Sequence, residues 1–142
     1  MKKVLIINGP NLNLLGKRET EIYDIKSFDE IYDELKKFAE KNAIELSYFQ
    51  SNLEGEIIDK IHESIEKIDY IIINAGALTH YSYSLLDAIK AAKIPTIEVH
   101  ISNIFAREQW RKKSVISPAA KGIISGLGTG VYMLALNYVS SQ

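Results

Sequence analysis

The chain has 142 residues with a formal net charge of -1, 46% hydrophobic and 25% charged, which is typical of a globular domain. It has no cysteine, which excludes disulfides, thiolate metal sites and a cysteine nucleophile. The balanced charge offers no basic surface for nucleic acid or an anionic membrane. No apolar run could span a membrane, and Val4–Ile7 is too short for the apolar part of a signal peptide. We therefore expect one cytoplasmic domain over residues 1–142, with no nucleic-acid or membrane partner.

Apolar, β-branched runs predict five short strands. They lie at residues 4–7, 44–49, 69–75, 94–100 and 122–125. Between them, hydrophobic residues recur at helical spacing. Ser27 and Ser51, each with a glutamate three residues later, form capping boxes that predict the starts of two helices, and the first ends at Asn42. A third helix begins at Ser82 or Ser84.

The remaining helices complete an alternating order of strands and helices. The second helix is expected to bury Ile57, Ile58, Ile61, Ile65 and Ile68. A short basic helix is expected over Ala106–Lys113 and a final apolar helix over Val131–Val139. Repeated strand–helix units form a parallel sheet with helices on both faces. We therefore predict an α/β, flavodoxin-like, three-layer fold with five parallel strands in the order 2-1-3-4-5.

One long segment, Leu12–Lys26, interrupts this alternation. Its polar part, Gly16–Asp24, shows neither helical nor strand periodicity. Connections of this length without secondary structure are usually lids or binding loops. The alternative is a surface loop without a binding role. We expect a lid over about residues 16–26.

The strand predicted at residues 94–100 ends in polar side chains. Pro95 can open a strand but cannot lie in the middle of a central one. Glu98, His100 and Ser102 are two residues apart and therefore point to the same side of the strand. A carboxylate beside an imidazole can set its tautomer and basicity. The alternative is a strand that reaches the surface and becomes polar there.

Polar residues follow three of the predicted strands, and in such folds ligands bind at the carboxyl ends of the strands. These residues are Asn8–Asn11, Asn74–His80 and Glu98–Ser102. The lid supplies Arg18 and Tyr23, and the basic helix supplies Arg107 and Arg111, four residues apart on one face. One crevice would thus gather a base, an acid, two amides and several guanidinium groups.

Two other patterns suggest different ligands. The glycines at 126, 128 and 130 resemble a dinucleotide fingerprint, but Val131 replaces the last glycine and the run follows the final strand instead of the first. We expect these glycines to let the last helix pack close to the sheet. His80 and His100 could bind a metal together, but the chain has no cysteine and no tight motif of histidine and carboxylate ligands. We therefore expect no metal.

The motifs taken together resemble type II 3-dehydroquinate dehydratase. They are Asn8–Gly16, Asn74–His80, Glu98–Asn103, Ala106–Glu108 with Arg111, Ser117–Pro118 and Gly122–Gly128. Their order and spacing match the family over essentially the whole chain. The resemblance implies anti elimination of water from 3-dehydroquinate to 3-dehydroshikimate through an enolate, in the shikimate pathway. It also implies that the reaction uses no cofactor and no Schiff base.

The resemblance further implies roles for individual residues. Tyr23, as a tyrosinate, would be the base, His100 the acid that protonates the leaving hydroxyl, Asn11 the holder of a water that stabilises the enolate, and Arg18 the cation that favours ionised Tyr23. Substrate binding is implied for Asn74, His80, Asp87, Ile101, Ser102 and Arg111. Asp87 would reach in from a neighbouring subunit, because the family forms trimers packed into a dodecamer.

The residue types suit this chemistry independently of the resemblance. A phenol with a pKa of about 10 is a poor base near neutral pH unless cations favour its anion, and Arg18 and Arg107 can supply them. Glu98 can tune His100. One departure lies in the lid, where Thr20 and Asp24 replace a proline and a glycine common in the family. These two replacements are expected to affect the stiffness and closing of the lid.

The main alternative is a flavodoxin-like binding or signalling module. A phosphorylation receiver would carry an acidic cluster after its first strand, and a flavin carrier would have a serine- and threonine-rich phosphate loop there. Asn8–Asn11 has neither feature. The reaction itself could serve aromatic biosynthesis or quinate breakdown, and the sequence leaves both roles open.

Overall fold

The computed structural model describes residues 1–16 and 26–142, and its centre is a five-stranded parallel sheet. The strands are β1 (Lys2–Asn8), β2 (Ile44–Gln50), β3 (Tyr70–Asn74), β4 (Thr96–His100) and β5 (Gly122–Ser125). Their order across the sheet is β2-β1-β3-β4-β5, with every neighbouring pair parallel. This confirms the predicted fold class and strand order.

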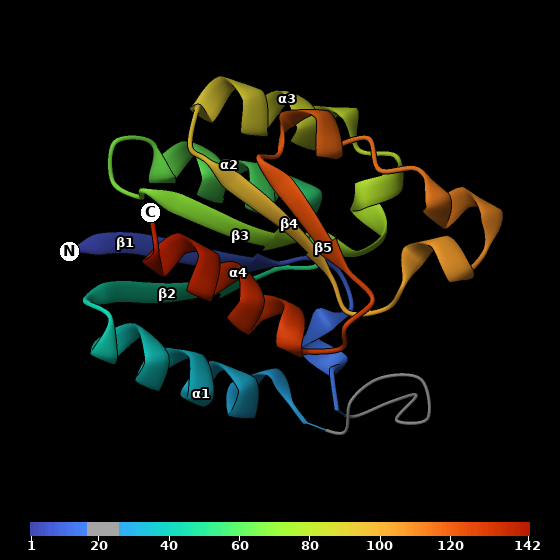
Figure 1. Cartoon of the computed structure of the whole chain (residues 1–142). Coiled ribbons are helices and arrows are strands. Elements are labelled where there is room, and N and C mark those ends of the chain that lie inside the picture. Colours follow the sequence, from blue (N-terminus) through green and yellow to red (C-terminus); the bar gives the residue numbers. More distant parts are fainter. Residues whose placement is uncertain (17–25) are drawn as a thin grey trace.

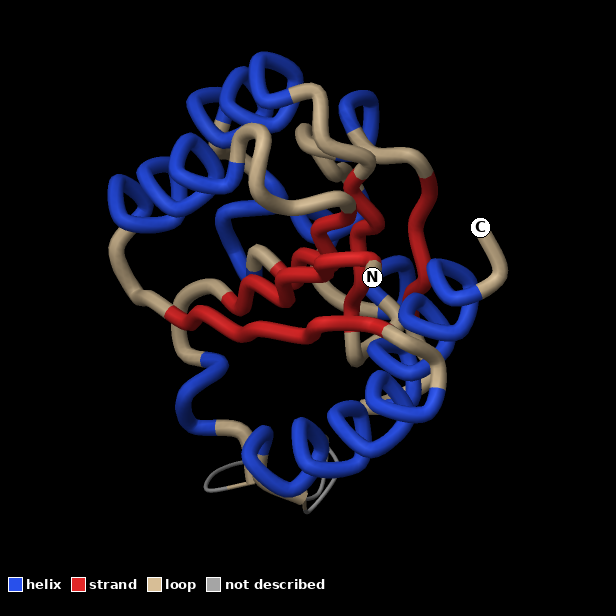
Figure 2. Tube along the Cα trace, turned by 90° about the vertical axis from the view of Figure 1, so that its left-hand side faces the viewer, coloured by secondary structure: helices blue, strands red, loops and turns tan. Residues whose placement is uncertain are grey.

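Helices cover both faces of the sheet, so the domain has three layers (Figures 1 and 2). One face carries α1 (Phe28–Lys41) and α4 (Gly130–Ser140), and the other carries α2 (Glu54–Ser64) and α3 (Tyr83–Ala92). Two hydrophobic clusters result, because successive side chains of each strand point to opposite faces. In β1, for example, Ile6 packs in the cluster with α1 and α4, and Ile7 packs in the other.

Two of the predicted helix starts are confirmed. The hydroxyl of Ser27 accepts a hydrogen bond from the backbone N–H of Glu30, and that of Ser82 accepts one from the N–H of Leu85. The capping box at Ser51 is wrong. The N-cap of α2 is Leu53, and the Ser51 hydroxyl accepts from the N–H of Leu53 before the helix begins.

The prediction also made α2 too long. It ends at Ser64, whose hydroxyl donates to the carbonyl of Lys60. Ile65 is consequently exposed and Ile68 is only partly buried, whereas both were expected in the buried stripe. Glu66, with φ of 65°, lies in the left-handed region, which a continuing α-helix cannot accommodate.

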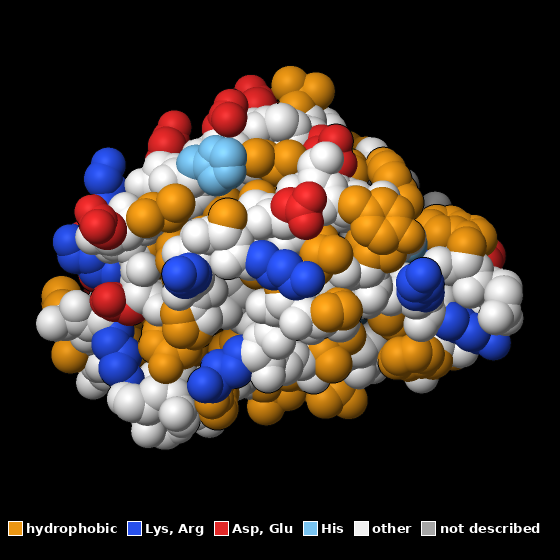
Figure 3. Space-filling model, turned by 90° about the horizontal axis from the view of Figure 1, so that it is seen from above, with side chains coloured by type: hydrophobic (Ala, Val, Ile, Leu, Met, Phe, Trp, Pro, Cys, Tyr) orange, Lys and Arg blue, Asp and Glu red, His pale blue; other side chains and the backbone are white. Residues whose placement is uncertain are grey.

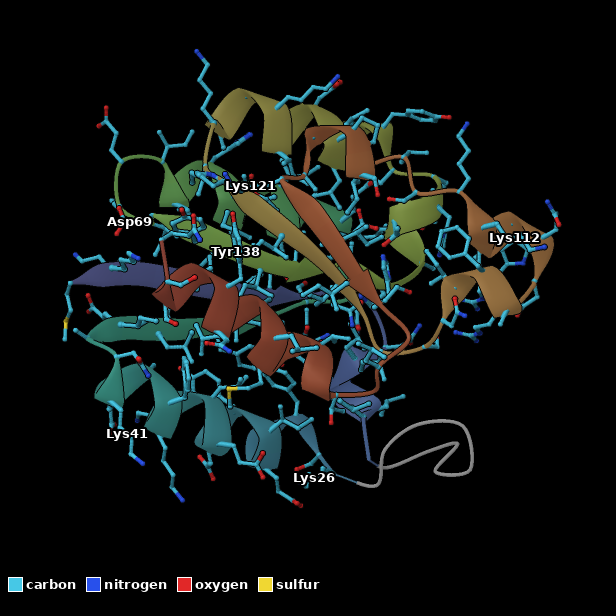
Figure 4. The ribbon with its side chains drawn as sticks, in the orientation of Figure 1. Lys26, Lys41, Asp69, Lys112, Lys121 and Tyr138 are labelled. Carbon is cyan, nitrogen blue, oxygen red and sulfur yellow. The ribbon has the colours of Figure 1, made fainter. Side chains whose placement is uncertain are left out.

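The basic helix expected over Ala106–Lys113 is replaced by two 3-10 helices, η3 (Ile104–Ala106) and η4 (Gln109–Lys112). We call Ile104–Lys112 the arm. Arg107 between them has an extended backbone, so the helix cannot run through. The arm projects beyond the edge of the sheet, and Figure 4 labels Lys112 on it.

The surface carries charge of both signs. On the face shown in Figure 3, acidic and basic side chains lie together with exposed hydrophobic side chains. Within residues 1–16 and 26–142, no helix is long and apolar enough to cross a membrane.

Candidate active site

A polar pocket opens where β1, β3 and β4 end, beside the arm. Figure 1 shows that these strand ends point toward the side of the molecule where the arm lies. The carboxyl ends of parallel strands meet at one edge of the sheet, so residues far apart in the chain meet here. The pocket is lined by Pro10, Asn11, Leu12, Asn74, Gly76, Ala77, His80, His100, Ile101, Ser102, Ile104, Arg107 and Arg111.

The loops after β1 and β3 form one wall because their backbones touch. A Cβ atom on Gly9 would lie 2.5 Å from the carbonyl oxygen of Ala75, a separation that side chains do not tolerate. Gly76 has a φ of 59° and faces the backbone of Pro10, so it too requires glycine. Gly9 comes directly after Asn8 and Gly76 comes two residues after Asn74, and these two asparagines, which end their strands, are paired in register.

The Asn74 amide is held in one orientation by buried partners. Its Nδ2 donates to the hydroxyl of Tyr132 over 3.0 Å, and its Oδ1 accepts from the backbone N–H of Gly76 over 3.2 Å. The Tyr132 hydroxyl in turn donates to Oδ1 of Asn8 over 2.7 Å. If the Asn74 amide were flipped, its NH2 group would meet the backbone N–H of Gly76, and two donors cannot bond to each other. The hydrogen bonds therefore fix the orientation of the Asn74 amide at the pocket.

Glu98 and His100 form a buried pair at the end of β4. Nε2 of His100 lies 2.5 Å from Oε2 of Glu98, and the Glu98 side chain is fully buried. Burial alone would raise the pKa of Glu98, but hydrogen bonds from His100, Ser117 and Ser114 bring it below its ordinary value. An ionised carboxylate can only accept, so Nε2 of His100 carries a hydrogen and Nδ1 is the other protonation site.

His80 lies beside His100, with ring centres 6.3 Å apart. Its Nδ1 is 2.8 Å from the carbonyl oxygen of Lys113. A carbonyl only accepts, so Nδ1 carries the hydrogen and Nε2 of the neutral ring is an acceptor. Burial lowers the pKa of His80, and the neighbouring His100 and Arg111 lower it further.

Two arginines of the arm bring positive charge to the pocket. Nη1 of Arg107 donates to the Ser102 hydroxyl over 3.2 Å. Nε of Arg111 donates to Glu108 over 3.1 Å, and its guanidinium lies 4.1 Å from the centre of the Trp110 ring. Arg107 and Arg111 both line the pocket, although no helix places them on one face. The Arg107 backbone is extended, and its side chain reaches Ser102 in the loop after β4.

Most of the residues predicted for the site do meet in this pocket. These are Asn11, Asn74, His80, His100, Ile101, Ser102, Arg107 and Arg111. Glu98 is not in the lining but lies behind His100. Asp87 is exposed on α3 and does not line the pocket of its own chain among the residues described. Arg18 and Tyr23 lie outside the described residues. So does the rest of the expected lid, except its flanking residues Gly16 and Lys26.

Four residues that support the site were not predicted: Trp110, Ser114, Ser117 and Tyr132. Tyr132 lies in the apolar helix expected over Val131–Val139, and no pattern in the sequence indicates which residues its hydroxyl contacts. The expected role of the glycine run is not found at two of its three glycines. A Cβ on Gly126 would lie 2.9 Å from that of Asn103, so its close contact is with the loop after β4, and a Cβ on Gly130 would have no atom within 4 Å.

The pocket has the groups needed to bind a small anionic, hydroxylated molecule and to move a proton on it. Two guanidinium groups and Ser102 can bind oxygen atoms, and His100, which is held in place by Glu98, can transfer a proton. In the part of the chain that the structure describes, no group of three or more histidine, aspartate or glutamate side chains could hold a metal ion. Fold and pocket together define an α/β enzyme with a flavodoxin-like sheet and an acid–base site at the strand ends.

Comparison with known proteins specifies this class further. The pattern of the family described as dehydroquinase class II matches residues 2–140, and the chain belongs to that family. The 3-dehydroquinate dehydratase of Caldicellulosiruptor bescii is 61% identical over 137 residues, covering 96% of this chain and 94% of the relative. That of Bacillus subtilis is 49% identical over 142 residues, covering 100% and 96%. The crystal structure of type II dehydroquinase from Butyrivibrio crossotus superposes with a TM-score of 0.95 at 43% identity, covering 99% of this chain and 98% of that one.

Proposed function

We propose that this protein is a 3-dehydroquinate dehydratase, a hydro-lyase of the shikimate pathway that leads to chorismate and the aromatic amino acids. The observation that carries the proposal is the buried Glu98–His100 pair opening onto a pocket lined by Arg107 and Arg111. The pair suits proton delivery, and the arginines suit a substrate carboxylate and hydroxyl groups. Family membership supports the same reaction.

In the proposed reaction, the base removes a proton from the carbon beside the substrate ketone, and the electron pair of the broken C–H bond forms an enolate. Tyr23, ionised with the help of Arg18 and Arg107, is the proposed base. A water held by Asn11 stabilises the enolate oxygen. When the enolate collapses, the C–O bond breaks and His100 gives its proton to the departing hydroxyl, which leaves as water.

The other proposed roles concern binding and assembly. Asn74, His80, Ile101, Ser102 and Arg111 are the proposed substrate-binding residues, and all five line the pocket. We propose that Asp87 serves a neighbouring subunit, within trimers packed into a dodecamer in the cytoplasm. Its exposure on α3 supports that placement. Light scattering and activity at increasing dilution test it, because dissociation would separate Asp87 from the site that it completes.

The reaction is tested by mixing the protein with 3-dehydroquinate and recording the ultraviolet absorbance of the conjugated enone product. We expect absorbance to grow with the parent protein and not with His100→Ala. No lysine lies among the lining residues of the described pocket, so borohydride added with substrate should not inactivate the enzyme. A borohydride-trapped adduct on any lysine would replace the enolate route by an imine route.

A further inference from the structure

The carboxylate of Glu98 is surrounded by hydrogen-bond donors from two directions. Its Oε2 faces His100, while Oε1 accepts from the Ser117 hydroxyl over 2.6 Å and from the Ser114 hydroxyl over 3.1 Å. Because Glu98 is fully buried, these three side chains supply the hydrogen bonds that water would donate to a carboxylate at the surface. A buried carboxylate without such donors would take up a proton more readily.

The two serines belong to a short segment, Lys113–Ser117, that is itself firmly attached. The Ser114 hydroxyl accepts from the backbone N–H of Ser117 over 3.1 Å. The N–H of Val115 donates to the carbonyl of Thr79 over 2.8 Å, and Val115 and Ile116 are both buried. The carbonyl of Lys113 contacts His80. One segment therefore contacts His80 directly and His100 through Glu98.

We propose that Ser114 and Ser117 are positioning residues of this enzyme: their hydroxyl groups hold the Glu98 carboxylate in the orientation that orders His100 for proton transfer. This inference rests on the proposed function for its catalytic consequence, but not for its structural one. It assigns the segment after the arm a part in the chemistry, although neither serine lines the pocket.

We expect the charged groups around the pair to remain in place when a serine hydroxyl is removed. Among the residues that the structure describes, His80 faces the pair from η2 (Gly76–His80), and Arg107 and Arg111 face it from the arm. The hydroxyl of Tyr132, from α4, is directed to asparagines instead. Loss of either serine hydroxyl therefore raises the pKa of the Glu98 carboxyl group. Loss of the Ser114 hydroxyl also removes the acceptor of the Ser117 backbone N–H, so Ser117→Ala is the cleaner test.

Protonation of Glu98 would remove the acceptor that orders His100, so turnover should fall on the acidic side of the pH–rate profile. In Ser117→Ala we expect that acidic limb to move to higher pH and kcat to fall about 10-fold, with KM little changed. Ser114→Ala should have a smaller effect because its hydrogen bond is longer. The double variant should show a larger shift of the acidic limb and a larger fall in kcat than either single variant. Ser117→Thr, which keeps a hydroxyl, should restore the parental pH–rate profile.

A matched control is Ser64→Ala, which removes a buried hydroxyl bonded to the carbonyl of Lys60, away from the pocket. Carboxyl 13C NMR of glutamate-labelled protein follows the titration of Glu98 without turnover, and Glu98→Gln assigns its signal. We expect that titration to move to higher pH in Ser117→Ala and to stay in place in Ser64→Ala.

The outcomes separate the two proposals. The role of the serines would be overturned if both serine-to-alanine variants kept the Glu98 titration and the turnover of the parent. It would also be overturned if the turnover of Ser117→Thr were no higher than that of Ser117→Ala. A parent inactive on 3-dehydroquinate would overturn the proposed function, and the shift in the Glu98 titration would then still support the structural role of the serines.

Discussion

The guanidinium of Arg111 lies over the Trp110 ring, with its central carbon 4.1 Å from the ring centre. The same ring meets the ring of His80 edge-on, with centres 5.4 Å apart. Trp110 is half-exposed, yet it contacts two residues that line the pocket. A cation over an indole face is attracted by the ring quadrupole, so Trp110 limits where the Arg111 charge can lie.

Replacing Trp110 by leucine should therefore weaken substrate binding. A partly exposed cation–π contact contributes about 0.5–1 kcal/mol, so we expect KM to rise roughly two- to fivefold with kcat nearly unchanged. Trp110→Phe, which keeps an aromatic face, should lose less. Phe105→Leu is the matched control, because Phe105 is an exposed aromatic residue of the same arm. Equal KM values for Trp110→Leu and Phe105→Leu would argue against this role.

Replacing Tyr23 by phenylalanine should remove the proposed base and keep the ring. The expected loss of turnover is at least about 100-fold, the usual contribution of a general base, with unchanged folding by circular dichroism. Tyr83→Phe is the control, since Tyr83 is exposed on α3 and does not line the pocket. Turnover near the parental level in Tyr23→Phe would exclude this residue from the mechanism.

Tyr132→Phe should destabilise the fold. Loss of the hydroxyl would leave the buried amides of Asn8 and Asn74 each short of a partner, and an unsatisfied buried group costs about 1–3 kcal/mol. Tyr138→Phe on the exposed side of the same helix is the control. Urea denaturation measures both, and equal midpoints would show that the hydroxyl of Tyr132 contributes nothing to stability.

His80 should make stability depend on pH. Burial lowers its pKa in the folded protein below the ordinary histidine value of 6.5, so at intermediate pH the unfolded chain binds more protons. The stabilisation is complete above that value and is lost as pH falls toward the folded-state pKa. His80→Gln should therefore show a shallower decline than the parent between about pH 7 and pH 5.

Denaturant midpoints measured at several pH values test this prediction. His62→Gln is the control because His62 is exposed on α2, and its decline should match that of the parent. If His80→Gln declines as steeply as the parent, the pKa of His80 is not lowered by the fold.

The sequence alone could predict the fold and most of the pocket because both follow from local patterns. Apolar runs locate the strands, strand ends of a parallel sheet converge, and polar residues such as Asn74 and His100 stand out at those ends. The contacts of Ser114, Ser117 and Tyr132 could not be predicted, since they join elements far apart in the chain. The interruption of the helix at Arg107 could not be predicted either, because Ala106–Lys113 contains good helix formers. The hydrogen bond from Arg107 to Ser102 is seen only in the structure.

The hydrogen bonds of Tyr132 join α4, the last of the described elements, to β1, the first. The same side chain also orients the Asn74 amide at the pocket. The docking of α4 against the sheet and the shaping of the pocket therefore depend on one hydroxyl group, so a change that loosens this helix should also disturb the site.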